Sequence, residues 1–477
     1  MTSSADILAA LDPEQREVVC RSGRPLAVTA GPGTGKTRAL TARLAHGAAS
    51  GQIDPQAALA VTFTTRAAQE LRDRLAAWGV EGVQARTIHS AAWRQASHFW
   101  PRVFGCALPR LCSQPTDLLA PLVDRLGWSS RPGLTRDLAQ EIAWTKQSNV
   151  LPESYPGLAA GAGRRVVGLT ADQVADTIGE YERVKQGQGL IDFDDILLCA
   201  AAVLESSEEA ARQMARRYRH FVVDEFQDVS PIQSRLIDLW TGSCQDVCVV
   251  GDPAQTIHRY AGARSQYLTG YAARRGGLSL RLTRNYRSSP QILALANALM
   301  ADHGGVRLVG RPQPGPPVEV RPAETAQAEA TELVAWLSEL ATGGLDWSDL
   351  AVLYRQHSQA EVLLRALRRA GLPVAAIDPA LTRLGYGDDR GAADQAGLTL
   401  ATLHAAKGRQ WRAVALVGLQ EGDLPHGRAR TAEDLAEERR LFYVGLTRAQ
   451  DHLRLSWNRG GGAGRPASRF LAELPLG

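Results

Sequence analysis

The chain contains 477 residues, more than one hydrophobic core usually organises, so we expect two or three domains. Its apolar content of 44% and charged content of 22% are typical of an ordinary soluble globular protein. No apolar run approaches the length of a membrane span, and the first residues lack the basic start of a signal peptide, so we expect no membrane association. The net charge of +4 permits a polyanionic partner without requiring one.

The six cysteines are scattered along the chain without a C-x-x-C pair. This pattern indicates neither a zinc site nor a disulfide framework, and it fits a reducing cytoplasm. The basic residues are almost all arginine, since only residues 36, 146, 185 and 407 are lysine. Two of these lysines fall inside motifs described below, which suggests sites where arginine would not serve, although chance placement would be a reasonable explanation for Lys407 alone.

A capped helix start is expected at residues 11–18, before the first apolar strand at 26–29. Gln15 lies in this helix, and its amide could pair with an adenine edge. Taken alone, Gln15 is better interpreted as a surface residue.

A glycine-rich turn follows the first strand and leads into a second helix. The turn consists of Ala30, Gly31, Pro32, Gly33, Thr34, Gly35, Lys36, Thr37 and Arg38. Its glycines let backbone N–H groups curl around a polyphosphate, and the following helix points its positive end at the same place. This is a P-loop, in which Lys36 would meet the β- and γ-phosphates and Thr37 would hold Mg²⁺. A chance Lys-Thr pair in an ordinary turn is the alternative, which the order of strand, glycines, Lys-Thr and helix disfavours.

Strand then helix recurs at residues 57–65 and 67–75, which predicts a parallel α/β sheet. Ligands of such sheets gather at the carboxyl ends of the strands, so Phe63 and Thr65 are expected on the functional edge. An aromatic ring there suits a base face, although core packing explains Phe63 equally well. Residues 86–90, which include His89, end another short strand in the same way.

Four apolar or aromatic residues run into two carboxylates at residues 221–228. In a nucleotide hydrolase this is the Walker B strand, where Asp224 completes the Mg²⁺ shell and Glu225 orients or deprotonates the attacking water. A strand end with solvated acids is the weaker alternative. Between the P-loop region and this strand, residues 91–189 have an irregular helical pattern that predicts an inserted helical domain.

The remaining candidate residues follow later strands and helices. Gln255 ends the buried strand at 247–255 and is placed to sense a γ-phosphate, and His258 and Tyr260 just beyond it could stack on bases. Tyr286 and Arg287 open what we expect to be a second α/β domain. Arg448 closes a helix at 437–449 and could supply a second guanidinium across a cleft.

Taken in order, these motifs resemble those of superfamily 1 DNA helicases of the UvrD/Rep/PcrA type. The matching segments are 30–38, 61–75, 87–90, 192–198, 222–228, 250–263, 285–288, 402–408 and 437–449. They span nearly the whole chain, and the ordered set is far more specific than any one segment.

The resemblance implies an α/β protein with two RecA-like P-loop domains, each a parallel sheet flanked by helices, and a helical insertion in the first. The first domain would comprise residues 1–92 and 190–280, the inserted domain residues 93–189, and the second domain residues 281–477. ATP would bind between the two RecA-like domains, and single-stranded DNA would cross both while being pulled 3′ to 5′.

Site residues are implied by the same resemblance. Gln15 and Tyr286 would hold the adenine, the P-loop would bind the phosphates, and Thr37 and Asp224 would bind Mg²⁺. The catalytic set would be Lys36, Glu225, Gln255, Arg287 and Arg448. The DNA track would be formed by Phe63, Thr65, His89, His258, Tyr260 and His404.

The sequence departs from the pattern of this family in several places. Residues 379–396 are a short polar stretch where relatives carry the large mobile domain called 2B, and residues 458–466 lack the aromatic residue of a strand-separating pin. Ala261 and Gln410 replace a common arginine and a common glutamate, and Ala30 replaces the usual first glycine of the P-loop. We also expect no nuclease or zinc module after Phe470.

The expected function is therefore an ATP-dependent 3′–5′ single-stranded DNA translocase and helicase that acts in DNA repair or replication. Its partners would be single-stranded DNA or a 3′-tailed duplex, and a protein partner could supply regulation or strand separation. One alternative is a translocase or motor subunit that displaces proteins without separating strands. Another is a DNA-binding scaffold with a vestigial ATP site. An RNA track is less favoured because nothing in the sequence reads a 2′-hydroxyl.

Overall fold

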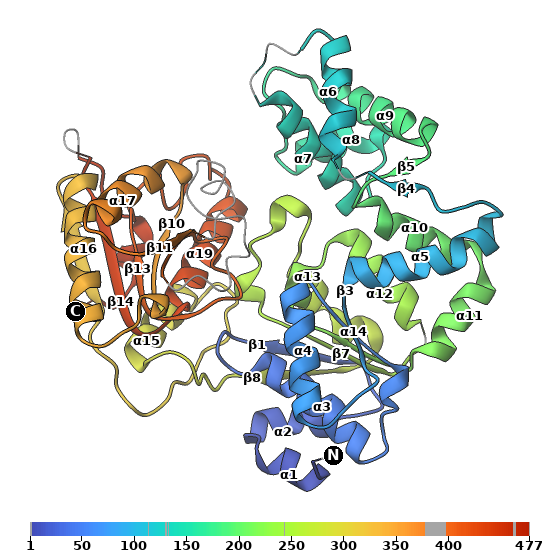
Figure 1. Ribbon diagram of the computed structural model, residues 1–477, viewed down its shortest axis with the longest axis horizontal. Helices are drawn as coiled ribbons and strands as arrows, with labels where there is room; N and C mark the ends of the chain where they lie inside the picture. The colour runs from blue at the N-terminus through green and yellow to red at the C-terminus, as the bar shows by residue number, and fades with distance from the viewer. Residues whose placement is uncertain are drawn as a thin grey trace. The chain divides into compact units, whose positions relative to one another are not determined.

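The computed structural model describes residues 2–112, 114–128, 131, 133–242, 244–376, 397–460 and 464–476 (Figure 1). It divides into two compact units. The first comprises Met1–Val28, Thr37–Gly251 and His258–Leu280, and the second comprises Thr29–Lys36, Asp252–Ile257 and Arg281–Gly477. None of the helices in the described part of the chain combines the length and the apolar character needed to cross a lipid bilayer.

The first unit is built on a six-stranded sheet with the order β3-β2-β6-β7-β1-β8. Its strands are β1 (Leu26–Ala30), β2 (Ala58–Thr62), β3 (Gln84–Thr87), β6 (His220–Val223), β7 (Asp246–Gly251) and β8 (Leu278–Leu282). β2 pairs in parallel with both β3 and β6, and β6 pairs in parallel with β7. Parallel pairing brings the carboxyl ends of these strands to one edge of the sheet.

Helices cover this sheet and bury its apolar strands. α4 (Thr65–Ala77) and α5 (Ile88–Phe104) both contact β2 and β3. Val61, Val223 and Val249, one from each of β2, β6 and β7, join the same buried core. The other helices of this unit are α1 (Ser4–Ala9), α2 (Pro13–Cys20), α3 (Lys36–Ala49), α10 (Asp195–Ser206), α11 (Glu208–Arg217), α12 (Pro231–Thr241), α13 (Gln266–Thr269) and α14 (Tyr271–Arg275).

A group of four helices interrupts the first unit and has a core of its own. These helices are α6 (Pro115–Arg125), α7 (Leu134–Gln147), α8 (Tyr155–Gly161) and α9 (Ala171–Gly187). Leu122, Leu138 and Val174, from three of them, meet in one buried cluster that also contains Trp144. The short strands β4 (Arg110–Leu111) and β5 (Leu190–Ile191) pair in parallel where the chain enters and leaves this group. We refer to residues 115–187 as the helical insertion.

The second unit contains another six-stranded sheet, with the order β11-β12-β10-β13-β14-β9. Its strands are β9 (Glu319–Ala323), β10 (Leu350–Tyr354), β11 (Val374–Ala376), β12 (Leu398–Thr402), β13 (Trp411–Leu416) and β14 (Ala449–Asn458). All five neighbouring pairs run parallel. The flanking helices are α15 (Pro290–Leu299), α16 (Ala326–Thr342), α17 (His357–Arg369) and α19 (Ala432–Leu446).

Strand β10 shows how this sheet is buried on both faces. Ala351 and Leu353 belong to a core that includes residues of α15 and α19, whereas Val352 and Tyr354 belong to a core that includes residues of α16 and α17. Side chains alternate along a strand, so a strand covered on both faces is apolar throughout. The predicted fold class is confirmed: the protein is α/β, with parallel sheets flanked by helices and a helical insertion in the first unit. The expected 2B replacement at 379–396 lies outside the described residues.

Candidate nucleotide and nucleic-acid sites

The P-loop joins strand β1 to helix α3 through a glycine-rich turn. Gly33 and Gly35 have φ angles of 69° and 80°, in the left-handed region that favours glycine. Thr34 closes the turn by donating from Oγ1 to the carbonyl oxygen of Gly31 across 2.7 Å. Lys36 begins α3, and its Nζ lies 3.3 Å from the carbonyl oxygen of Ala30. The lysine ammonium therefore lies over the loop in which phosphates are expected to bind.

The same loop is contacted by the segment that carries Tyr286 and Arg287, with which it shares the second unit. Asn285 donates from Nδ2 to the carbonyl oxygen of Pro32 across 2.6 Å, and the backbone N–H of Tyr286 donates to Gly33 across 2.9 Å. Asn285 Oδ1 in turn accepts the backbone N–H of Arg287 at 2.8 Å. Asn285 thus connects the P-loop to the turn that presents Arg287, a role that the sequence alone did not reveal.

Asp224 and Glu225 follow strand β6 in a strained turn. Glu225 has a φ of 54°, which is uncommon for a residue other than glycine and is often found at functional sites. Its carboxylate accepts a hydrogen bond from Gln227 Nε2 at 2.6 Å, and its backbone N–H donates to Asp224 Oδ1 at 2.9 Å. Gln227 also donates to Asp228 at 3.0 Å. The buried amide of Gln227 therefore fixes the Glu225 carboxylate, and nothing in the sequence pattern assigned Gln227 this role.

The second unit brings Gln255, Arg287 and Arg448 together. Arg448 is 2% exposed and donates from Nη2 to Gln255 Oε1 across 3.1 Å. Arg287 donates from Nη1 to the carbonyl oxygen of Thr447, the residue before Arg448, across 3.3 Å. Lys407 Nζ donates to the backbone carbonyl of Gln255 at 2.8 Å. The side chains of Arg448 and Gln255 are thus joined directly, and Arg287 is linked to them through the backbone of Thr447.

The two residues predicted to hold adenine belong to different units. Tyr286 is exposed in the second unit. Gln15 lies in α2 of the first unit and is only 2% exposed, so the interpretation of Gln15 as a surface residue is wrong. Its burial follows from the packing of α2, which also buries Val18 and Val19.

An aromatic stack lies at the carboxyl edge of the first sheet. His89 stacks on Phe193 with ring centroids 4.2 Å apart and an interplanar angle of 19°. Phe193 is 55% exposed, although a large apolar ring usually lies inside. Burial lowers the pKa of His89 to about 4, so its imidazole is neutral at pH 7. Among the described residues, neither His89 Nε2 nor Thr62 Oγ1 has a hydrogen-bond partner, although both atoms are buried.

Phe193 was not among the predicted site residues. The sequence does contain a signal for it, because Phe193 is an aromatic residue between aspartates just before a helix. It lies in segment 192–198, which was among the segments that resemble the family. Phe63 is half-buried and packs against the core of the first unit. Its ring is therefore compatible both with core packing and with contact to a base. Thr65 is exposed at the first turn of α4.

The other predicted DNA-track residues occupy two places. His258 and Tyr260 lie in the first unit with ring centroids 5.8 Å apart at 74°, and Tyr260 is exposed. His404 lies in the second unit, where burial and the nearby Arg355 lower its pKa to about 4. His404 is therefore neutral at pH 7 and can act only through its ring and its hydrogen bonds.

Comparison with known families decides the classification of this chain. The family model of the UvrD/REP helicase N-terminal domain matches residues 11–273, which is more than half of the chain. The model of the UvrD-like helicase C-terminal domain matches residues 280–380 and 379–460. The chain belongs to the UvrD-like helicase family.

Curated relatives agree with this classification. The chain is 37% identical over 575 residues to the ATP-dependent DNA helicase UvrD2 of Mycobacterium tuberculosis, an alignment that covers 98% of the chain and 82% of the relative. It is 32% identical over 398 residues to UvrD1 of the same organism, covering 78% of the chain and 50% of the relative. It is 27% identical over 380 residues to PcrA of Bacillus subtilis, covering 77% and 50% respectively.

Two features of these matches bear on the shortened region of this UvrD-like helicase. The alignment with UvrD2 runs over 575 positions although the present chain has only 477 residues, so the relative contains many residues within the matched span that this chain lacks. The two segments matched by the C-terminal family model meet at residues 379–380. From the sequence, we expect the 2B domain to be replaced by a short stretch that begins at the same residue, 379.

The residues of this UvrD-like helicase fit a magnesium-bound nucleoside triphosphate. The first turn of α3 contains no acidic side chain, so its positive end is available to phosphates. Thr37 and Asp224 would supply the hydroxyl and carboxylate oxygens that Mg²⁺ prefers. The guanidinium of Arg38, which was also predicted to bind the nucleotide, donates from Nη2 to the carbonyl oxygen of Ala10 at 2.5 Å.

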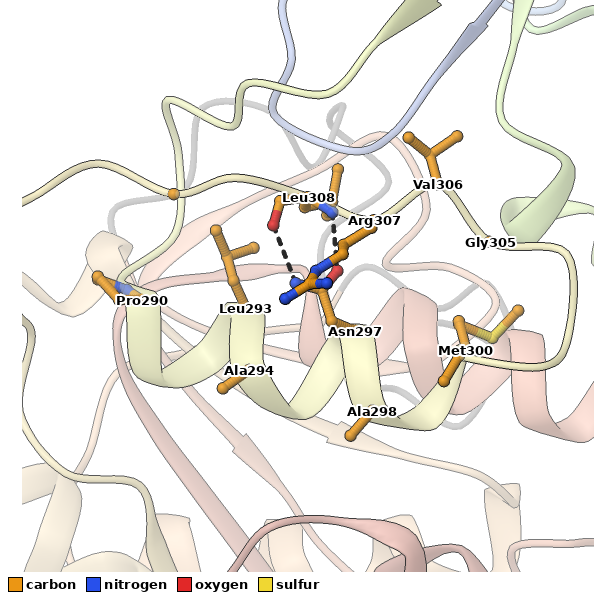
Figure 2. A pocket seen from close by; sticks show the side chains of 12 residues that line it. Pro290, Leu293, Ala294, Asn297, Ala298, Met300, Gly305, Val306, Arg307 and Leu308 are labelled. Atoms are coloured by element: carbon orange, nitrogen blue, oxygen red, sulfur yellow. Dashed lines mark hydrogen bonds between the residues drawn. The ribbon is translucent and has the colours of Figure 1, made fainter.

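A separate hollow of about 610 Å³ lies between α15 and the segment 305–310 (Figure 2). Asn297 spans it, because its amide accepts the backbone N–H of Leu308 at 2.8 Å and donates to the carbonyl oxygen of Leu308 at 2.9 Å. None of the residues that line it was predicted to bind ATP or DNA. The hollow is therefore lined by other residues than the predicted sites, and one of them, Leu308, packs against Gly31 of the P-loop.

Proposed function

We propose that this UvrD-like helicase hydrolyses ATP with Mg²⁺ in response to single-stranded DNA, moves along that strand from 3′ to 5′ and separates duplex ahead of it, in DNA repair or replication. The strained Glu225, fixed by Gln227 beside Asp224, carries the proposal. A scaffold with a vestigial ATP site would have no need to hold a carboxylate in this conformation. Residues 1–92 and 190–280 would form the first RecA-like domain, residues 93–189 the inserted domain and residues 281–477 the second RecA-like domain.

The proposed chemistry gives each of these residues its own task. Bound Mg²⁺ would neutralise charge on the phosphates. Lys36 and the P-loop N–H groups would hold the β- and γ-phosphates, while Glu225 would orient the attacking water and accept its proton. Gln15 and Tyr286 would hold the adenine.

The group formed by Gln255, Arg287 and Arg448 would contact the γ-phosphate. Phosphoryl transfer spreads negative charge over the transferred group, and preorganised guanidinium groups stabilise that charge. The bond between Arg448 and Gln255 orients one guanidinium. Hydrolysis would then depend on how these guanidinium groups meet the γ-phosphate, which would link turnover to movement.

The DNA track would use rings more than charge. The exposed Phe193 stacked on a neutral His89, together with Tyr260, offers faces on which bases can stack. The unpaired Nε2 of His89 would gain a hydrogen-bond partner from the bound strand. Phe63, Thr65, His258 and His404 would complete the track.

The test is a steady-state ATPase assay of the full chain with no nucleic acid, single-stranded DNA, duplex DNA or RNA. We expect strong stimulation by single-stranded DNA that Lys36→Ala abolishes. A wild-type rate that single-stranded DNA does not raise, or a Lys36→Ala variant that still turns over, would overturn the proposal. Unwinding of a 3′-tailed but not a 5′-tailed duplex would establish the direction.

A second candidate is a translocase or motor subunit that does not separate strands by itself. The shorter C-terminal region favours it, since UvrD2 carries residues within the matched span that this chain lacks. Part of the segment 458–466, where an aromatic pin was expected to be missing, lies outside the described residues. Efficient unwinding of a 3′-tailed duplex by the isolated chain would remove this candidate, whereas movement without unwinding would favour it.

A further inference from the structure

Lysine is rare in this chain, yet two of its four lysines are buried side by side. Lys146 lies in α7 and Lys185 lies in α9, both within the helical insertion, and each is almost fully buried. Neither belongs to a motif assigned above. A buried ammonium group is costly unless it is paired, so this position requires a specific set of partners.

The partners are three carboxylates that connect the insertion to the start of α10. Glu182 lies in α9, whereas Asp192 and Asp195 flank the turn before α10. Lys146 Nζ pairs with Asp192, with Asp195 at 2.8 Å and with Glu182 at 2.9 Å. Lys185 Nζ pairs with Asp195 at 2.5 Å, with Glu182 at 2.7 Å and with Asp192 at 3.3 Å. We refer to these five residues as the lysine–carboxylate cluster.

The cluster is fully interlinked and leaves no vacant place for a cation. The three carboxylates lie close enough together to bind a metal ion, but the two ammonium groups already occupy the space between them. Tyr181 adds a hydrogen bond from its hydroxyl to Asp192 at 2.9 Å. Burial alone would raise the pKa of Asp192, but Lys146 and Lys185 outweigh it and lower the pKa to about 2. The carboxylate is therefore charged at every physiological pH.

Asp192 also shapes the turn that presents Phe193. Its Oδ1 accepts the backbone N–H groups of Asp194 and Asp195 at 3.1 and 3.2 Å, and its own N–H donates to Asp195 at 2.8 Å. These bonds close the backbone immediately around Phe193. A second connection runs from Ser230 to Gln147 at 2.7 Å and from Gln147 to Asp194 at 2.5 Å.

We propose that Lys146 and Lys185 are positioning residues. Through them the helical insertion holds the turn that carries Phe193, so that the Phe193 ring stacks on His89, and this stack sets the affinity for single-stranded DNA. The inference rests on the proposed function in one respect, namely that the His89–Phe193 stack contacts DNA. It goes beyond that function because it assigns the insertion a defined task. The lysines touch neither DNA nor nucleotide and act only through Asp192 and Asp195.

The shape of the ammonium group explains why lysine occurs here in an arginine-rich chain. Each Nζ reaches three carboxylates in different directions, which a compact ammonium with three donors can do. A guanidinium is planar and directs its donors into one fixed fork. Lys146→Arg therefore keeps the charge but cannot reproduce the geometry.

The chain offers a matched pair of mild variants. Tyr181→Phe removes a 2.9 Å hydrogen bond to Asp192 in the cluster, and Tyr155→Phe removes a 2.9 Å hydrogen bond to Glu141 elsewhere in the insertion. Both tyrosines are equally buried. We expect Tyr181→Phe to raise the concentration of oligothymidylate that gives half-maximal ATPase stimulation by about threefold, and Tyr155→Phe to leave it unchanged. Lys146→Arg and Lys185→Arg should raise it by about tenfold, a loss of the size that one base stack contributes.

A double-mutant cycle separates positioning from general damage. In a Phe193→Ala background the stack is already absent, so Lys146→Arg should add less than about twofold to the half-maximal DNA concentration. The maximal ATPase rate and the KM for ATP should stay close to those of the parent. An equal weakening of DNA binding with and without Phe193, or no weakening by any cluster variant, would overturn the proposal.

Hydrogen exchange gives a readout that does not depend on DNA. The amides of Asp194 and Asp195 should lose protection in Lys146→Arg and Tyr181→Phe but not in Tyr155→Phe. If single-stranded DNA fails to stimulate the wild-type chain, the proposed function fails while this measurement still tests the positioning of the turn. Unchanged protection in all the cluster variants would refute the positioning role even in a chain that DNA stimulates.

Discussion

Arg448 donates a hydrogen bond from Nη2 to Oε1 of Gln255 across 3.1 Å, and so joins the end of helix α19 to the segment that follows strand β7. Two further donors of the same guanidinium are used by backbone carbonyls, Nε by Val444 at 2.9 Å and Nη1 by Arg409 at 3.0 Å. These three bonds hold the side chain in one orientation. Preorganisation of this kind is what allows a charge to stabilise a transition state without a reorganisation cost.

Replacing Arg448 by lysine should lower the ATPase kcat by at least about 10³-fold, because lysine keeps one charge but cannot satisfy the same fork of acceptors. The KM for ATP should change much less, as expected for an interaction made in the transition state. Arg439→Lys is the control, since Arg439 lies on the same helix and donates to the carbonyl of Leu299 outside the candidate site. Comparable kcat values for the two variants would argue against a catalytic role for Arg448.

Gln227→Met should lower kcat by about 10- to 100-fold with little change in nucleotide affinity, because Glu225 would lose the donor that fixes its carboxylate. Gly251→Ala should have the same effect by an independent route, since a Cβ at Gly251 would overlap Gln227 Oε1. Steady-state kinetics and equilibrium binding of a fluorescent ATP analogue measure both quantities. If both variants hydrolyse ATP at the wild-type rate, Gln227 does not position the catalytic carboxylate.

Gly33 and Gly23 allow backbone strain to be separated from crowding. Their φ angles of 69° and 72° are nearly equal, but a Cβ at Gly33 would lie 2.6 Å from Asn285 Nδ2, whereas a Cβ at Gly23 would meet nothing within 4 Å. Gly23→Ala should therefore cost about 1 kcal/mol of stability and leave ATP binding intact. Gly33→Ala should also abolish ATP binding. Urea unfolding and nucleotide titration compare the two variants, and equal ATP affinity would show that the loop tolerates the added methyl group.

His89 should make the protein less stable as the pH falls. Its folded-state pKa of about 4 lies below the ordinary value of 6.5, so the unfolded chain binds the proton more tightly and stability is lost as the pH drops from about 6.5 to about 4. Between pH 7.5 and pH 5 the wild type should lose up to about 2 kcal/mol more than His89→Gln. Urea unfolding at the two pH values measures this difference, and parallel pH profiles would show that His89 titrates normally.

The sequence alone was sufficient for those features that depend on neighbouring residues. The P-loop around Lys36, the carboxylates after β6 and the alternation of strands and helices are local patterns, and the structure has the corresponding elements at nearly the expected bounds. The order of the motifs along the whole chain indicated the family, which the family match confirms. The assignment of individual residues to ATP and DNA stays a prediction.

Other features depended on contacts between residues far apart in the chain and could not be predicted in the same way. The bond from Asn285 to Pro32 joins residues 253 positions apart, and the pairing of Lys146 with Asp192 joins residues 46 positions apart. The exposure of Phe193 depends on how the helical insertion closes the turn beside it. Gln15 was misjudged for a similar reason, since the burial of one helical position depends on what packs against that helix.

The scarcity of lysine makes the protein a natural reporter for amine chemistry. Lys146 and Lys185 are buried and paired, whereas Lys36 and Lys407 are half-buried beside the candidate nucleotide-binding residues. An acylating reagent applied to the native protein should therefore modify few side chains, and mass spectrometry could follow each one separately. Shielding of Lys36 by added nucleotide would then footprint the occupied P-loop without any engineered label.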